Sequence, residues 1–184
     1  MIKPVQIPIS SSLQNSGLLF LINFRKATER DLVALEWNGE YSHYRQLYKE
    51  IFESAQKGDA ILWLADLKDV GIIGQLFVQL ISVRMELADG MSRAYLYAFR
   101  IKPNYRRNGI GSYMLSYVEW NLIERGYHYI CLNVNRDNIE ARELYERSGY
   151  RIIAAEAGYW HYIDNQGKRQ YVHEPAWRME KELG

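Results

Sequence analysis

The segment that most restricts the fold of this chain lies between residues 92 and 149. It begins with "SRAYLYAFRI", which is apolar on both faces apart from its arginines, as in a central strand covered on both sides. A loop with two glycines, an apolar helical stripe and a second buried strand, "YHYICLNVN", follow in that order. Because a strand, a helix and a strand in succession form a βαβ unit, the two strands are predicted to be parallel neighbours.

Two helices are predicted in this segment. Apolar residues recur every four positions from Ile110 to Leu122, which predicts a helix that ends near Gly126. The second helix, "IEARELYERSG", comes after the second strand. The side chain of Asn138 can cap its first turn, and Gly149 suits its last.

The segments on either side predict antiparallel strands and two further helices. We predict a strand in "LLFLINFRKAT", a helix over "ERDLVALEW" capped by Thr28, and a helix over "YSHYRQLYKEIFESAQKG". "AILWLADL" and "IIGQLFVQLISVRM" predict a hairpin, and "YRIIAAEAGYWHYI" with "RQYVHEPAWRMEKEL" a longer one. We therefore expect one α/β domain over residues 1–184, with an N-terminal arm at residues 1–18. Its sheet is predicted to be mixed and mostly antiparallel, with a central parallel strand pair flanked by helices.

Charge and apolar content exclude several classes of protein. The 23 basic and 22 acidic side chains leave a net charge of +1, so no overall field attracts nucleic acid or an anionic membrane. The apolar run Gly17–Phe24 is far short of the roughly 20 residues of a membrane helix. The single cysteine, Cys131, lies in a predicted buried strand and is interpreted as a core residue. We expect a cytoplasmic protein that binds neither nucleic acid nor membrane.

The glycine loop, "NYRRNGIGSYML", can bind an anion. Gly109 and Gly111 allow close backbone approach, and the start of the following helix adds N–H groups without helical partners. Arg106 and Arg107 add cations that can grip phosphate oxygens. The loop lacks the Lys-Ser/Thr pair of a nucleotide P-loop and the third glycine of a dinucleotide-binding turn. On its own it fits either a phosphate cradle or an ordinary strand-to-helix turn.

A second motif gives the loop an identity. Arg-x-x-Gly-x-Gly after an apolar strand, followed by "NVNRDNIEARELYERSGY", resembles the acetyl-coenzyme A (acetyl-CoA) binding core of the GNAT N-acetyltransferase superfamily, here over residues 92–151. The resemblance implies the single-domain GNAT fold and acetyl-CoA as cosubstrate, with no metal. The residues it assigns to the cofactor are Phe99, Arg100, Ile101, Arg106, Arg107, Asn108, Gly109, Ile110, Gly111, Ser112, Asn138 and Tyr145.

The same resemblance suggests how transfer would be catalysed. Tyr145 would protonate the departing thiolate, because a tyrosine with a pKa of about 10 remains protonated at neutral pH. Without the resemblance, Tyr145 would be interpreted as a core residue of its helix. Backbone N–H groups near Phe99 and Ile101 would lie beside the pantetheine and could polarise the thioester carbonyl.

The general base and the acceptor pocket have no motif. Glu40 is the candidate base, chosen from a set that borders the acceptor site in this family: Glu36, Glu40, His43, Glu156 and His161. Water could serve instead. Aromatic residues of the second helix region and the late hairpin are expected to line the acceptor pocket, with core packing as the alternative: Tyr41, Tyr44, Trp160, Tyr162 and Trp177.

The predicted function is N-acetyl transfer from acetyl-CoA to a primary amine, by direct attack in a ternary complex. The acceptor amine belongs to a small molecule, a peptide or a protein, and the enzyme is a monomer or a homodimer. A non-catalytic regulatory module that binds acyl-CoA is the alternative. A nucleic-acid binder is disfavoured, because no basic stripe interleaved with aromatic residues occurs in the sequence.

Overall fold

The computed structural model describes residues 16–184. Most of the predicted N-terminal arm therefore lies outside the described residues. The elements in chain order are α1 (Ser16–Phe20), β1 (Ile22–Lys26), the 3-10 turns η1 (Glu29–Asp31), η2 (Ala34–Glu36) and η3 (Ser42–Tyr44), α2 (Arg45–Lys57), β2 (Ala60–Leu67), β3 (Gly71–Gln79), β4 (Arg93–Ile101), η4 (Pro103–Tyr105), α3 (Ile110–Ile123), β5 (Tyr129–Asn135), α4 (Ile139–Arg147), β6 (Arg151–Glu156), β7 (Tyr159–Ile163), β8 (Arg169–His173) and β9 (Ala176–Glu182).

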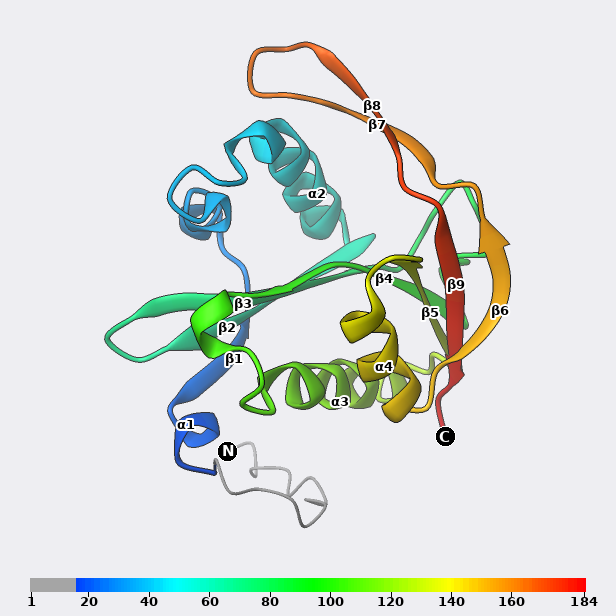
Figure 1. The fold of residues 1–184 in the computed structure, drawn as a ribbon, viewed down its shortest axis with the longest axis horizontal. Coiled ribbons are helices and arrows are strands. Elements are labelled where there is room, and N and C mark those ends of the chain that lie inside the picture. Colours follow the sequence, from blue (N-terminus) through cyan, green and yellow to red (C-terminus); the bar gives the residue numbers. More distant parts are fainter. Residues whose placement is uncertain (1–15) are drawn as a thin grey trace.

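A seven-stranded mixed sheet forms the centre of the molecule, in the order β1-β2-β3-β4-β5-β9-β6. β4 and β5 pair in parallel, and every other neighbouring pair in this sheet is antiparallel. Helices α3 and α4 cover one face and α2 covers the other (Figure 1). The predicted α/β fold class is confirmed, including the parallel pair around the helix that starts at Ile110.

Two apolar cores hold the helices onto the sheet. On the α3 side, fully buried Leu96, Leu115 and Leu132 belong to one cluster that also includes Tyr145. On the α2 side, Tyr48 and Ile51 pack against Phe77. Because β4 carries apolar residues on both faces, it can contribute to both cores, as a central strand must.

The parallel pair separates after only a few residues. The register of β4 with β5 runs from Arg93–Tyr129 to Leu96–Leu132, while β4 continues to Ile101 alongside β3. The β3–β4 register shifts beside this point, and Ala98 has a left-handed backbone conformation with φ 49°. The last residues of β4 therefore present their β5-facing backbone groups outside the strand ladder.

The N-terminal half differs from the sequence prediction in two places. "ERDLVALEW" forms two 3-10 turns, η1 and η2, instead of one α-helix. Trp37, Asn38 and Gly39 adopt positive φ values directly after η2, which ends helical propagation there. The predicted strand in "LLFLINFRKAT" starts only at Ile22, since the preceding residues form the short helix α1.

The long C-terminal hairpin is present but divided. β6 pairs with β9 within the main sheet, and β7 pairs with β8 in a separate two-stranded sheet that extends past α2 (Figure 1). Gly158 joins the two parts, and its carbonyl accepts a hydrogen bond of 2.9 Å from the backbone N–H of Glu174. A Cβ at this glycine would fall on the carbonyl group of Glu174.

The Gly158 junction can be tested by substitution. Gly158→Ala should lower the free energy of unfolding by roughly 1–2 kcal/mol for its left-handed φ of +75°, plus about 1–3 kcal/mol for the overlap with Glu174. Gly167→Ala is the matched control, because Gly167 has φ +79° but a Cβ added there would meet nothing within 4 Å. Urea unfolding of both variants measures the difference. Equal stabilities would contradict a tightly packed junction.

Candidate active site

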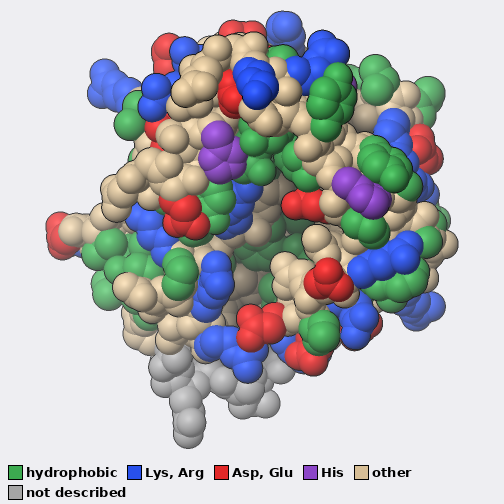
Figure 2. Space-filling model, turned by 45° about the horizontal axis from the view of Figure 1, so that its top comes forward, with side chains coloured by type: hydrophobic (Ala, Val, Ile, Leu, Met, Phe, Trp, Pro, Cys, Tyr) green, Lys and Arg blue, Asp and Glu red, His purple; other side chains and the backbone are tan. Residues whose placement is uncertain are grey.

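A cavity of about 610 Å³ opens between the end of β4, the glycine loop and α4. Figure 2 shows a hollow in one face of the molecule, with basic and acidic side chains around it. Ten of the twelve residues that the sequence assigns to the cofactor line the cavity: Phe99, Arg100, Ile101, Arg106, Arg107, Gly109, Gly111, Ser112, Asn138 and Tyr145. The other two do not line it. Ile110 is buried in the core, and the side-chain amide of Asn108 donates to the carbonyls of Tyr105 and Arg106.

The glycine loop turns sharply into α3. Arg107 and Gly109 have positive φ values of 64° and 76°, and Tyr113 N–H makes the first i→i−4 bond, to Gly109. The backbone N–H groups of the residues just before Tyr113 lie at the start of the helix, ahead of this first bond. N–H groups in that position stabilise a bound anion. Gly111 lies between Leu144 and Phe99, since a Cβ there would be in ordinary van der Waals contact with both, at 3.4 and 3.6 Å.

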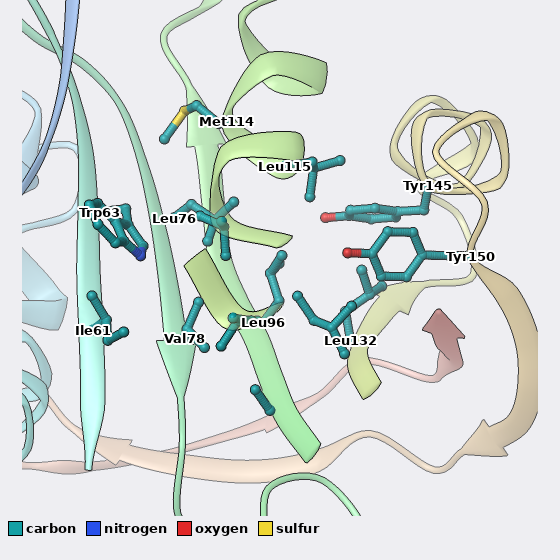
Figure 3. Packing of buried hydrophobic residues seen from close by; sticks show 14 of the residues in the cluster. Ile61, Trp63, Leu76, Val78, Leu96, Met114, Leu115, Leu132, Tyr145 and Tyr150 are labelled. Carbon is teal, nitrogen blue, oxygen red and sulfur yellow. The ribbon is translucent and has the colours of Figure 1, made fainter. Parts of the chain in front are cut away.

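Helix α4 forms the opposite wall. The side chain of Asn138 caps it, accepting a hydrogen bond of 3.1 Å from Ala141 N–H, as the sequence predicts. Tyr145 is 7% exposed and makes a T-shaped contact with Tyr150 at 5.7 Å between ring centroids. Figure 3 shows both rings extending from the α4 end of the core toward Leu115 and Leu132. Burial raises the pKa of Tyr145, so its hydroxyl keeps its proton at neutral pH.

The wall contains residues that the sequence prediction missed. Besides Tyr105 and Ala141, these are Glu140, Glu143, Leu144 and Arg147 on α4. Their spacing of three and four residues puts them on one side of the helix, and Tyr145 lies at the edge of that side. The helical period could therefore have found them once Asn138 had been placed at the cavity. Arg147 lies 3.4 Å from Glu143, so one cation of this wall is paired.

An aromatic cluster adjoins the cavity on the α2 side. We define it as Tyr41, His43, Tyr44, Tyr48, Trp160 and Tyr162, which come from the turn before α2, from α2 itself and from β7. Tyr44 is central, with ring centroids 4.1 Å from His43, 4.8 Å from Tyr162 and 6.3 Å from Trp160. Tyr41 lines the cavity. The structure thus brings the predicted acceptor aromatics together, except Trp177.

Trp177 packs elsewhere. It lies against the core on the α3 side, and the guanidinium of Arg136 lies 4.3 Å from its ring centroid. Trp177 is on β9, which inserts between β5 and β6. The sequence predicted a simple hairpin and therefore could not place this strand in the interior of the sheet.

Two of the candidate bases are held in ion pairs. Glu36 is buried and accepts hydrogen bonds of 2.6 and 2.7 Å from Arg45, which lowers the pKa of its carboxyl. Glu156 is bound by Arg178 and by Arg84, and its pKa is also lowered because these hydrogen bonds outweigh burial. Paired carboxylates with lowered pKa values are weak proton acceptors.

The remaining candidates are less constrained. Glu40 is exposed and lies beside Tyr41; burial, and then the hydrogen bond to Glu40, raise the pKa of that tyrosine. His43 belongs to the aromatic cluster. His161 points to the outer side of β7, where its ring centroid is 6.1 Å from that of Tyr171. Glu40 and His43 both adjoin Tyr41, which lines the cavity; the ring centroids of His43 and Tyr41 are 6.2 Å apart.

The single cysteine of the chain is buried and chemically inert. Cys131 is fully buried, its Sγ donates to the carbonyl of Leu87 at 3.2 Å, and burial raises its pKa to about 11. In the described part of the chain, histidine, cysteine and acidic residues form no group of three or more that suits a metal ion. Among residues 16–184, no helix has the length and apolar character needed to cross a membrane.

Comparison with known proteins agrees with this arrangement. Residues 27–150 match the acetyltransferase (GNAT) family. The chain is 25% identical over 125 residues to N-alpha-acetyltransferase 50 of Danio rerio, covering 67% of this chain and 68% of that protein.

Solved structures share the fold at lower identity. The ribosomal-protein-S18-alanine N-acetyltransferase of Escherichia coli matches with a TM-score of 0.65 at 19% identity, over 89% of this chain and 94% of that chain. The spermidine/spermine N-acetyltransferase SpeG of Vibrio cholerae matches with a TM-score of 0.67 at 15% identity, over 91% and 95%. The family match spans more than half of the chain and includes the glycine loop and α4. The chain therefore belongs to the acetyltransferase (GNAT) family, whose members use acetyl-CoA.

Proposed function

We propose that this protein is an N-acetyltransferase that transfers the acetyl group of acetyl-CoA to a primary amine by direct attack in a ternary complex. One observation carries the proposal: the open end of β4, the glycine loop and the Tyr145 side chain line a single cavity. A site for acetyl-CoA requires these three features together. The end of β4 supplies a backbone edge, the glycine loop supplies an anion site, and Tyr145 supplies a proton donor.

The residues present fit acetyl-CoA. Its diphosphate is an anion of the kind that a glycine loop and a helix N-terminus bind, with Arg106 and Arg107 on the rim. The pantetheine amides match the edge of β4 beyond Leu96, where no β5 partner occupies the backbone. Arg106 Nε donates to the carbonyl of Ile101 at 2.9 Å, which shows that this carbonyl can accept a hydrogen bond from outside the sheet.

Proton transfer is assigned to Tyr145. When bound, acetyl-CoA supplies the thioester that the amine attacks, and the departing sulfur must gain a proton. Tyr145 lines the cavity, and burial raises its pKa, so its hydroxyl is protonated at neutral pH and can serve as the donor but not as a base. Cys131 is buried with a pKa of about 11, which disfavours an acetylated cysteine and supports direct transfer.

The attacking amine must lose a proton, since an alkylamine with a pKa near 10.4 is mostly charged at pH 7. We assign Glu40 as the candidate base because Glu36 and Glu156 are held by arginines. Glu40 lies next to Tyr41, on the side of the cavity that faces the aromatic cluster. The acceptor is accordingly placed on that side, with water available as a relay to Glu40.

The glycine loop is tested by Arg106→Ala. Loss of a charge-assisted contact to phosphate should weaken acetyl-CoA binding about 10- to 100-fold. Arg151→Ala is the control, since Arg151 is exposed on β6 and does not line the cavity. Gly109→Trp adds a steric test at the same loop. Calorimetric titration measures affinity, and circular dichroism checks the fold; unchanged affinity in both loop variants would exclude the phosphate cradle.

The proton donor is tested by Tyr145→Phe. Removing a general acid should lower kcat by roughly 100-fold or more, while the dissociation constant for acetyl-CoA changes little. Tyr150→Phe is the matched control, because Tyr150 is equally buried and contacts Tyr145 but does not line the cavity. The assay is thiol release with an amine panel. A Tyr145→Phe enzyme with full turnover would rule out the assignment.

A further inference from the structure

Arg100 stands at the boundary between the cavity and the aromatic cluster. Its side chain leaves β4 on the α2 side, where its guanidinium donates to the hydroxyl of Tyr48 at 2.9 Å. The same guanidinium lies 4.0 Å from the ring centroid of Tyr41 and 5.4 Å from that of Tyr44. Arg100 also lines the cavity. The predicted cofactor contact of this part of β4 is made by the backbone, so the side chain on the α2 side can serve another ligand. A fixed cation therefore faces the space where we place the acceptor.

Within residues 16–184, the charge of Arg100 has no carboxylate partner. Five arginines of this range are partly buried, and four of them form ion pairs within 4.0 Å: Arg25, Arg93, Arg142 and Arg178. Arg100 is the fifth and forms none in this part of the chain. Its partners are the hydroxyl and the ring faces of tyrosines, which hold a guanidinium without cancelling its charge.

The nearby carboxylates are engaged elsewhere or are exposed. Glu36 is bound through both oxygens by Arg45, and Glu174 accepts a hydrogen bond of 3.3 Å from the indole of Trp160. Glu40 is exposed beside Tyr41. A guanidinium has five N–H donors, and within the described residues the side chain of Arg100 makes one hydrogen bond, to Tyr48. The remaining donors can bind a carboxylate from a ligand in a bidentate manner.

We propose that Arg100 selects the acceptor: it binds the carboxylate of an amine that carries one close to the reacting nitrogen. This inference rests on the proposed function and names the acceptor class for the same site. The carboxylate can be that of a free amino acid or that of an acidic side chain near the N-terminus of a peptide. The aromatic cluster would contact the apolar part of either acceptor.

The same geometry disfavours a polyamine. A polyamine carries a further ammonium group instead of a carboxylate, and an ammonium group beside Arg100 would be repelled by the guanidinium in this partly buried site. The structural likeness to a spermidine/spermine acetyltransferase, at 15% identity, shows the fold alone. Spermidine is therefore tested as the alternative acceptor.

The first experiment compares matched acceptors at saturating acetyl-CoA by thiol release. The pairs are L-phenylalanine with L-phenylalaninamide, and the C-terminally amidated tripeptides Met-Asp-Ala and Met-Asn-Ala, with spermidine as the polyamine. Within each pair, only the carboxylate changes between substrate and partner. In at least one pair, the acidic member should be acetylated; we call this the responding pair. If the phenylalanine pair responds, the acceptor is a free amino acid, and if the tripeptide pair responds, it is a peptide. A preference for spermidine over every acidic acceptor would overturn the proposal.

The second experiment measures how Arg100 controls this preference. Arg100→Gln should lower the ratio of kcat/KM between the acidic and neutral members of the responding pair about 10- to 100-fold. Amine pKa differences within a pair cancel, because the same pair is compared between wild type and variant. Arg100→Lys keeps the charge without the bidentate geometry and should lower the ratio less. Arg151→Gln, an exposed arginine on β6, is the control and should leave the ratio unchanged.

Binding measurements separate a failure of the proposed function from a failure of the Arg100 proposal. If acetyl-CoA binds but no amine is acetylated, the proposed function fails. Calorimetric titration of L-phenylalanine and of the Met-Asp-Ala peptide into the CoA-loaded protein then still tests Arg100. Weaker binding of either probe by Arg100→Gln than by Arg151→Gln, with both variants saturated with CoA, would support the carboxylate site. Equal affinities of wild type and Arg100→Gln for both probes would contradict it, and so would an unchanged ratio in the kinetic experiment.

Discussion

The early separation of β4 from β5 is the constraint on which the rest of this structure depends. The two strands pair from Arg93 to Leu96, and beyond Leu96 the strand that pairs with β4 is β3. A closed sheet would have no cavity here. Because α3 follows β4 and α4 follows β5, the glycine loop and Tyr145 come to lie on opposite sides of the same opening. One local departure from regular pairing thereby positions residues from two helices and a strand.

Alternation along β4 divides the cavity into two sides. Phe99 points toward α3, where it lies close to Gly111, and Arg100 points toward α2, where it binds Tyr48. Successive side chains of a strand project to opposite faces, so neighbouring residues of β4 can serve different ligands. The side with the glycine loop suits an anionic cofactor. The opposite side combines aromatic rings with the guanidinium of Arg100, which is the basis for separating donor and acceptor.

The sequence predicted the features that depend on local chemistry. The βαβ unit, the Asn138 cap and the loop with its arginines are visible in short stretches with clear periodicity or capping residues. The helix expected after Thr28 was wrong: this segment forms two 3-10 turns, and the left-handed conformations of Trp37, Asn38 and Gly39 prevent any continuation. The Arg100–Tyr48 contact joins residues 52 positions apart. No spacing rule reaches that far, and the ion pairs that remove Glu36 and Glu156 as bases were equally invisible.

The tyrosines around Arg100 explain why its charge is preserved. Burial raises the pKa of Tyr48 although Arg100 opposes this, so the hydroxyl stays neutral at physiological pH. A glutamate in place of Tyr48 would hold the guanidinium as firmly but would form an internal ion pair and remove the attraction for an external anion. A neutral hydrogen-bond acceptor and two ring faces instead fix the orientation of Arg100 while leaving its net charge available. Orientation without neutralisation is what a site for a carboxylate-bearing substrate requires.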